Sequence, residues 1–343
     1  MNSRERIEAM LSGERLDRHV WAVSLSAFGG SLIACPMPKY FSDPDAYVRG
    51  QTAILEILET DVLFAPHCPA LEAEVLGCEV EYPVRQPPVI TAPAIPSVSE
   101  MARLPVLDVR RDSRLDFIYE SLEILNREHG RIVPLVAPIL GPLDLPGVLL
   151  GWENWFSVFQ QQEKGPRDSL LHWCEGFFVA YANRLLESGA TFLQVSLDGL
   201  NGRVVSRNEA KSSLIPFLGR VFAQVRGPLI LDHHASSVAS WFHDLQDLPN
   251  VVGLVVGRSD SLEELSSRLK PAFWLGGGMD RATLRDVSCE TLKQTCFRTL
   301  ESLPSDWRFV FSLVGGDAFT DTPIEKIRIL RDTVRAFPRE FVV

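Results

Sequence analysis

One carboxylate and two imidazoles stand side by side at the end of an apolar stretch of the chain. Residues 228–231 read Pro-Leu-Ile-Leu, and Asp232, His233 and His234 follow them directly. A carboxylate beside an imidazole can orient the ring, and both groups can move a proton or bind a metal ion. Successive side chains of a strand point to opposite faces, so the two histidines cannot both enter one pocket. Asp232 and His234 share a face and form the predicted reactive pair, with His233 in a structural position.

Further polar residues follow other apolar stretches. His67 and Cys68 come after residues 61–66, where an imidazole beside a thiol could act as a base or a ligand, or could belong to a capped loop. Asp198 precedes a glycine, which is also the pattern of a turn. Residues 276–278 are three glycines without the Lys and Ser/Thr of a phosphate-binding loop, so we expect a turn that lets a ligand approach closely.

These residues need elements to position them, and short apolar runs alternate with amphipathic stretches, as is typical of repeated βα units. Eight candidate strands occur, at residues 20–24, 61–66, 131–137, 191–197, 228–231, 251–256, 272–275 and 308–312. Apolar residues at helical spacing mark connections at residues 45–59, 167–188, 208–225, 261–269, 289–303 and 323–337. Eight βα units predict an α/β fold, a single (β/α)8 TIM barrel forming one domain over residues 1–343. Residues 78–112, rich in Pro and Val, are expected to form an excursion between the second and third strands.

In a barrel of this kind the active site lies in the loops that follow the carboxyl ends of the strands. Asp198 follows the fourth candidate strand, and we expect it to act in catalysis beside the reactive pair. The residues expected to line the substrate pocket are His67, Cys68, Arg258 and Gly277.

Composition excludes several classes of partner. The formal net charge is −10 and the pI is near 5.3, whereas nucleic-acid phosphates require a basic face. The six cysteines have no CxxC or regular spacing, which fits a reducing compartment. The chain opens with charged residues, and no apolar run reaches the roughly 18 residues that span a membrane. We expect a cytoplasmic protein that acts on a small-molecule substrate, with no nucleic acid and no membrane as partner. Whether the chain forms a homodimer stays open.

Several segments, in order along nearly the whole chain, resemble the uroporphyrinogen decarboxylase superfamily. They are Asn2-Ser-Arg-Glu-Arg-Ile7, Gly13-Glu-Arg-Leu-Asp-Arg18, Glu72-Ala-Glu-Val-Leu-Gly-Cys78 with Pro87-Pro88, Gly141-Pro142, Gly189-Ala190 and Thr322-Pro323-Ile-Glu325. Their details are more similar to the cobalamin-dependent methyltransferases, which include the methylcobamide:coenzyme M methyltransferases, than to the decarboxylases. The family fold is a single TIM barrel, in agreement with the strand count. The resemblance also implies that Asp198 lies near the substrate.

The decarboxylases of this superfamily hold a tetrapyrrole that bears many carboxylates, and they do so with arginines in the loop after the first strand. In this chain residues 21–30 contain no Arg or Lys. Guanidinium groups are the natural partners of carboxylates, so this loop argues against uroporphyrinogen as the substrate.

The methyltransferases bind zinc, which holds the acceptor thiol as a thiolate. Their ligands are a His-x-Cys at the end of the fifth strand and a Cys after the eighth, and the matching residues here are Asp232, His234 and Gly315. Carboxylate and imidazole also bind zinc. A divalent metal, whether zinc or a metal such as iron or manganese, could therefore be held by Asp232 and His234, with Asp317 or His67 as a further ligand.

The resemblance implies a methyltransferase that moves a methyl group between a corrinoid and a small, thiol-type acceptor. No corrinoid-binding Asp-x-His-x-x-Gly motif occurs, so the corrinoid is expected on a separate partner protein. Two alternatives stay open. One is a decarboxylase or lyase in which His234 is the acid or base and Asp232 orients it. The other is a non-catalytic protein that binds a tetrapyrrole or corrinoid.

Overall fold

The computed structural model of the chain describes residues 1–343 except 106, 161–163, 304–307 and 338–343. Its centre is a sheet of eight parallel strands in the order β1-β10-β9-β8-β7-β6-β5-β2. These strands are β1 (Val20–Trp21), β2 (Leu63–Phe64), β5 (Leu135–Ile139), β6 (Phe192–Ser196), β7 (Leu229–His233), β8 (Val251–Val256), β9 (Trp274–Asp280) and β10 (Phe309–Val314). Neighbours in the sheet are thus neighbours in chain order, apart from the pairing of β1 with β10.

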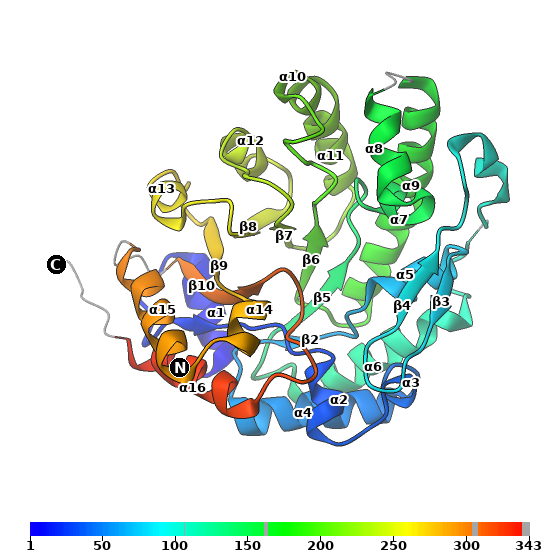
Figure 1. Cartoon of the computed structure of the whole chain (residues 1–343). Coiled ribbons are helices and arrows are strands. Elements are labelled where there is room, and N and C mark those ends of the chain that lie inside the picture. Colours follow the sequence, from blue (N-terminus) through cyan, green and yellow to red (C-terminus); the bar gives the residue numbers. More distant parts are fainter. Residues whose placement is uncertain (106, 161–163, 304–307, 338–343) are drawn as a thin grey trace.

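The sheet is curled, and its two end strands approach each other (Figure 1). The Asp61 amide, just before β2, donates a hydrogen bond to the carbonyl oxygen of Trp21 in β1 at 2.9 Å. The result is an α/β fold with a curled parallel sheet of eight strands, consistent with a TIM-barrel-like fold.

Helices surround the sheet (Figure 1). The longer ones are α1 (Ser3–Ser12), α4 (Pro44–Leu58), α6 (Ser113–His129), α8 (Trp152–Gln160), α9 (Lys164–Glu187), α11 (Ile215–Phe222), α15 (Cys289–Glu301) and α16 (Ile324–Ala336). The shorter ones are α2 (Phe28–Leu32), α3 (Met37–Tyr40), α5 (Pro69–Val75), α7 (Leu145–Leu150), α10 (Arg207–Glu209), α12 (Phe242–Gln246), α13 (Leu262–Ser266) and α14 (Arg281–Asp286). Within the described part of the chain, no helix combines the length and apolar character needed to cross a membrane.

The chain between β2 and β5 is the longest connection inside the sheet. It forms α5, the antiparallel strands β3 (Glu79–Glu81) and β4 (Val89–Ala92), a 3-10 helix at Val98–Arg103, and α6. The β3–β4 pair is a separate sheet. The helix expected at residues 208–225 is instead three segments, α10, a π-helical turn at Ala210–Leu214 and α11, because Pro216 has no N–H to close an α-helical hydrogen bond.

Each of the eight expected strands overlaps a strand of the sheet, although most bounds differ by a few residues. The largest difference is in β9, which continues through the three glycines that we expected to form a turn. A Cβ atom on Gly276 would lie 2.8 Å from the Val255 side chain, and one on Gly278 would lie 2.8 Å from the Phe311 ring. The glycines therefore let β9 pack closely against its neighbours, and the expected turn is wrong.

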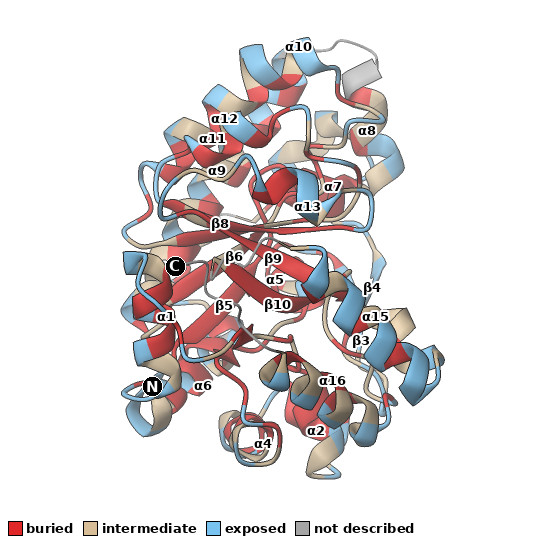
Figure 2. Cartoon of the chain, turned by 90° about the vertical axis from the view of Figure 1, so that its left-hand side faces the viewer, coloured by how far each residue is buried: buried red, intermediate tan, exposed pale blue. Residues whose placement is uncertain are grey.

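Apolar side chains fill the inside of the curled sheet near the amino ends of the strands. One cluster joins α1 to alternate strand residues, among them Ile7, Met10, Val20, Phe64, Val136, Phe192, Ile230, Val255, Trp274 and Val310. A second, larger cluster lies between the sheet and the helices. Figure 2 displays the resulting layers, with buried strands at the centre and the exposed residues on the outer faces of the helices.

Helix α1 is fixed to the sheet by a buried ionic network. The Asp61 carboxylate accepts hydrogen bonds from Arg6 at 2.7 Å and from Arg18 at 2.6 Å, and it also accepts one from the Trp21 amide at 2.8 Å. The helix itself begins with a capping box between Asn2 and Glu5. These N-terminal segments, which carry part of the family resemblance, therefore act in folding rather than in chemistry.

Candidate functional site

The reactive pair lies at the carboxyl end of β7, on the inner face of the sheet. Asp232 Oδ2 accepts a hydrogen bond of 2.7 Å from the Gln194 amide of β6, which fixes the carboxylate. The other oxygen, Oδ1, lies 3.2 Å from His234 Nδ1. Both of these atoms are buried, and neither has a hydrogen-bond partner of proper geometry among the residues described. Buried polar atoms without partners are uncommon in proteins, and their pairing here marks a site that a ligand can complete.

His233 points to the opposite face, as the parity of the strand predicts. Its side chain is fully buried, with Nε2 3.3 Å from the Ser236 hydroxyl and Nδ1 3.3 Å from Asp198 Oδ1. His233 therefore packs behind the strand and does not reach the inside of the sheet.

Asp198 holds the chain that carries His234. Its Oδ1 atom accepts hydrogen bonds from the backbone amides of His234 at 2.8 Å and Ala235 at 2.9 Å. The loop of Asp198 is itself held by Asp144, whose carboxylate accepts from the amides of Asp198 at 3.1 Å and Gly199 at 2.7 Å. The Asp198 carboxylate thus accepts hydrogen bonds from the backbone, and we interpret Asp198 as a positioning residue for His234.

The electrostatics of the pair favour a proton on His234. Burial raises the pKa of Asp232, although the neighbouring His234 opposes that shift. Burial also disfavours the imidazolium, but the carboxylates of Asp232, Asp198 and Asp144 outweigh it and raise the pKa of His234. By contrast, the pKa of Asp198 falls to about 2, because hydrogen bonding to His233 and the charge and amide of His234 overcome burial. His234 therefore keeps its proton to a higher pH than a free histidine does.

Asp317, a predicted metal ligand, does not join the pair. Its Oδ1 atom accepts from the Ser24 hydroxyl at 2.5 Å and the Ser26 amide at 2.8 Å, and its Oδ2 atom accepts from the Ala27 amide at 2.6 Å. The carboxylate thus links the loop after β10 to the loop after β1 by hydrogen bonds. Burial raises the pKa of Asp317 to about 6.

The mouth of the site is the opening formed by the loops that follow the carboxyl ends of the strands. The residues at this mouth do not fit the expected metal. In the part of the chain that the structure describes, no three His, Cys, Asp or Glu residues are grouped so that they could hold an ion. Asp232 and His234 offer two donors, one short of the three protein ligands of a catalytic zinc site. The third position, Gly315, has no donor of its own, and a Cβ atom there would lie 3.9 Å from Oδ2 of Asp280 and 4.0 Å from Nε of Arg281. The structure therefore does not bring the predicted ligands Asp232, His234 and Asp317 together into a metal site within the described residues.

His67 and Cys68 follow β2, and their side chains have different surroundings. The His67 amide donates to the Ser26 hydroxyl at 3.0 Å, while its ring has no hydrogen-bond partner in the described ranges. Burial, followed by the charges of His234 and Arg281, lowers the pKa of His67 to about 4, so this imidazole is neutral at pH 7. The Cys68 thiol donates to the Pro88 carbonyl at 3.1 Å, and burial raises its pKa to about 12. His67 is available to a ligand near His234, whereas Cys68 is a packed thiol.

The remaining two substrate-binding predictions find little support in the geometry. Arg258 is 73% exposed, with Nη1 3.9 Å from Asp280 Oδ1. Gly277 lies on the outer side of β9, where a Cβ atom would be 3.4 Å from Leu262 of α13. Gly277 therefore does not line the mouth. Its neighbour Gly276 is the inner glycine, since a Cβ atom there would lie 3.2 Å from the Ser312 hydroxyl.

Two residues of the site escaped the sequence analysis. Gln194 fixes Asp232, and its signal was present, because a glutamine at an inner position of an apolar strand is unusual. Arg281 lies beside Gly315 and acts on the pKa of both His67 and His234. Nothing in its sequence context indicates that its side chain turns toward the mouth.

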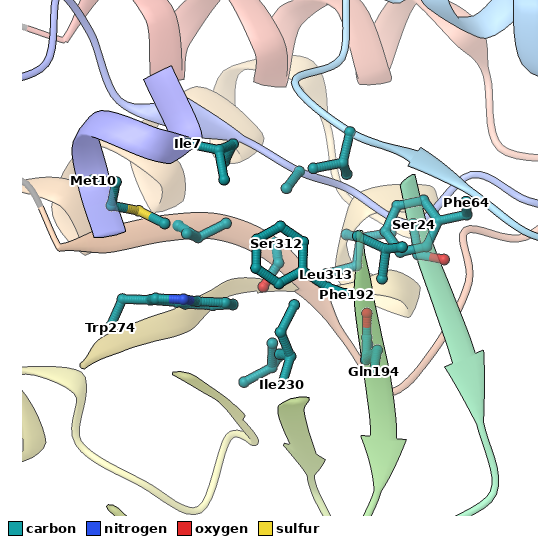
Figure 3. A pocket seen from close by; sticks show the side chains of 15 residues that line it. Ile7, Met10, Ser24, Phe64, Phe192, Gln194, Ile230, Trp274, Ser312 and Leu313 are labelled. Carbon is teal, nitrogen blue, oxygen red and sulfur yellow. The ribbon is translucent and has the colours of Figure 1, made fainter. Parts of the chain in front are cut away.

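A cavity lies inside the sheet, lined by residues of α1 and of the strands. It has a volume of about 40 Å³. Its walls are the apolar side chains of α1 and the strands, and Ser24, Gln194 and Ser312 contribute its polar groups (Figure 3). Gln194, which lines the cavity, also donates to Asp232, so one residue links the cavity to the reactive pair. A space of this size admits a few waters or a small group, because one water needs roughly 10–15 Å³ on this measure.

The sequence comparisons agree with this architecture. The family model described as "Uroporphyrinogen decarboxylase (URO-D)" matches residues 2–337, and the chain belongs to this family. The methylcobamide:CoM methyltransferase MtbA of Methanosarcina acetivorans is 29% identical over 160 residues, which are 46% of this chain and 46% of that protein. The methylated-thiol–coenzyme M methyltransferase of Methanosarcina mazei is 21% identical over 162 residues, 47% of this chain and 43% of that protein. The chain spans about half the length of the curated relatives it matches.

The structural comparison covers nearly the whole chain. A methyltransferase from Methanosarcina mazei has a TM-score of 0.83 at 20% identity, over 97% of this chain and 98% of that one. A B12-independent methionine synthase from Shewanella has a TM-score of 0.54 at 12% identity, over 92% and 95% of the two chains. At these identities the likeness establishes the fold. The expected superfamily is confirmed, and the curated relatives named here are methyltransferases, which agrees with the resemblance to that branch.

Proposed function

We propose that the protein is a methyltransferase that moves a methyl group between a corrinoid and a small acceptor, with the Asp232–His234 pair as its proton-transfer centre. The observation that carries the proposal is this pair, buried at the mouth with two unpartnered polar atoms that face each other 3.2 Å apart. The family relatives named for methyl transfer from methylcobamide support the choice of reaction.

The corrinoid is expected as a substrate carried by a separate protein, because the sequence contains no Asp-x-His-x-x-Gly motif. In the transfer, the carbon–cobalt bond breaks and its electron pair stays on cobalt. A lone pair of the acceptor forms the new bond to the methyl carbon. An acceptor such as a thiol loses its proton, and unprotonated His234 with Asp232 behind it can accept that proton. Activation of the acceptor by a base takes the place that a metal-bound thiolate would otherwise fill.

Methyl transfer from methylcobalamin tests this proposal. Loss of the methylcobalamin absorbance is followed anaerobically with a panel of thiols, for the wild type and for His234→Gln and Asp232→Asn. Each change should lower the rate about 100-fold or more, the usual contribution of a general base. His172→Gln is the matched control, since that histidine is 87% exposed. Wild-type rates in both variants would refute the role of the pair.

A decarboxylase or lyase acting on a small carboxylic acid is the second candidate. The observation in its favour is Arg281 at the mouth, a cation that suits a carboxylate substrate. Release of CO2 or of an unsaturated product, lost in His234→Gln, would favour this alternative. Binding of a corrinoid or tetrapyrrole with neither reaction would instead favour a non-catalytic binding protein.

A further inference from the structure

Arg281, the first residue of α14, occupies the space beside the turn that follows β10. A Cβ atom built on Gly315 would lie 4.0 Å from its Nε, and one built on Gly316 would lie 3.5 Å from its Nη1. Both glycines have positive φ, +84° and +100°, a backbone conformation that favours glycine. The turn therefore presents bare backbone to the guanidinium at the position where the family resemblance expects a metal ligand.

The guanidinium is held by an aromatic ring and not by a carboxylate. Its Cζ atom lies 4.7 Å from the centroid of the Phe319 ring. Among the residues that the structure describes, none forms an ion pair or hydrogen bond with the Arg281 side chain. Arg285, on the same helix and 4.2 Å from the same ring, differs because it pairs with Asp286 at 2.7 Å. Arg281 is thus a half-buried cation without an ion-pair partner among the described residues, and the Asp280 carboxylate lies beside the same turn, 3.9 Å from the Cβ position of Gly315.

The positive charge of Arg281 acts on the reactive groups. Burial is the largest influence on the pKa of His67, His234 and Asp317, and the charge of Arg281 also acts on all three. Asp317 is not hydrogen-bonded to Arg281; its two oxygens accept from Ser24, Ser26 and Ala27. The mouth therefore combines a fixed positive charge with a proton-transfer pair.

We propose that Arg281 binds a carboxylate of the small substrate and thereby directs the reacting end toward Asp232 and His234. The planar guanidinium can form two parallel hydrogen bonds to a carboxylate, with more geometric specificity than a lysine. This inference rests on the proposed function, since it names the substrate class of the same site. It predicts that acceptors without an anionic group bind poorly.

The test is calorimetric binding of 3-mercaptopropionate at low ionic strength, with 1-propanethiol as the probe that lacks the carboxylate. Wild type should bind 3-mercaptopropionate at least tenfold more tightly than 1-propanethiol. Arg281→Gln should remove that preference, and Arg281→Lys should keep part of it. Arg285→Gln is the matched control and should bind as wild type does, and circular dichroism verifies that each variant is folded. Equal affinity in wild type and Arg281→Gln would overturn the proposal.

Acetate, methanesulfonate and phosphate as competitors distinguish the kinds of anion. Competition by acetate that is stronger than that by methanesulfonate or phosphate supports a carboxylate site, and the reverse order overturns it. The assay requires neither corrinoid nor turnover. Carboxylate binding that depends on Arg281, together with no methyl transfer, would therefore keep this site and refute only the proposed function.

Discussion

The Asp198 carboxylate is hydrogen-bonded to the backbone amide of His234 at 2.8 Å, so a side chain of one loop sets the position of the reactive histidine of the next. The same oxygen also accepts from the Ala235 amide. The pattern recurs at Asp144 and Asp317, which bind the backbone of other loops at the mouth. At the rim of the site, carboxylates thus accept hydrogen bonds from backbone amides of neighbouring loops and hold these loops together.

Removing the Asp198 acceptor should loosen this rim. Asp198→Ala leaves two backbone amides without their acceptor and should lower the free energy of unfolding by about 2 kcal/mol. The fractional loss of methyl-transfer activity should be larger than the fractional loss of stability. Asp198→Asn keeps an acceptor oxygen and should retain most of the stability. Urea denaturation compares the two variants. Equal loss in both would mean that the charge, and not the hydrogen bonds, holds the loop.

The pH profile of methyl transfer should report His234. Its pKa is raised by Asp232, Asp198 and Asp144 despite burial, so the unprotonated base is lost as the pH falls through a value above the ordinary 6.5. Asp198→Asn removes one of these charges, and the inflection of kcat/KM should move to lower pH. An inflection that stays in place would exclude His234 as the titrating base. Asp244→Asn, at a partly exposed residue that does not act on the pKa of His234, serves as the control.

The fold could be predicted because its signals are local. Buried parallel strands appear as apolar runs, and amphipathic helices appear between them, so all eight strands were located. The glycines of β9 were misread, because only the Phe311 ring and Val255, distant in sequence, require their small size. Tertiary contacts of this kind leave no local pattern.

The candidate site, like the fold, contains residues that a local sequence pattern predicts and residues that only tertiary contacts define. Asp232 and His234 were predicted to share a face, since side-chain alternation is a property of the strand itself. Asp317 was misassigned because its partners Ser24 and Ala27 lie about 290 residues away in the chain. The direction of the Arg281 side chain depends on Phe319 and on the bare backbone at Gly315, and neither relation is visible before folding.

The contrast between the buried Cys68 and the exposed Cys289 gives a direct check of the Cys68 environment. Burial raises its pKa to about 12, and its thiol is bound to Pro88, so no reactive thiolate forms at pH 8. Cys289 is exposed. Iodoacetamide followed by peptide mass spectrometry should label Cys289 rapidly and Cys68 only after unfolding in urea. Rapid labelling of native Cys68 would restore it as a reactive group of the site.

The network around Asp61 should contribute more to stability than surface ion pairs do. Asp61 is fully buried and binds both Arg6 and Arg18. Asp61→Asn removes the carboxylate that pairs with Arg18 and leaves Arg6 with Asp17 alone, and it should cost about 3 kcal/mol of unfolding free energy. Lys211→Ala, which breaks a partly exposed pair with Asp244, should cost less than about 1 kcal/mol. Similar losses in the two variants would contradict the structural role of the network.

Glu72 should make the stability of the protein depend on pH in a direction opposite to that of most carboxylates. Its side chain is buried at the start of α5, accepts the Leu140 amide at 3.2 Å, and has a pKa that burial raises to about 8. The folded state therefore binds the proton more tightly than the unfolded state, whose carboxyl titrates near 4.5. This stabilising contribution is complete below pH 4.5 and is lost as the pH rises through about 8.

Glu72→Gln isolates this contribution, because glutamine keeps an acceptor for Leu140 and carries no charge. Above pH 8 the variant should be more stable than the wild type, with the full difference on the order of 5 kcal/mol. Near pH 5 the two proteins should unfold at similar urea concentrations. Glu120→Gln, at an exposed position of α6, is the matched control and should leave the pH dependence unchanged. If the wild type and Glu72→Gln lose stability in parallel between pH 5 and pH 8, Glu72 is ionised in the folded protein and its assignment as a buried neutral acid is wrong.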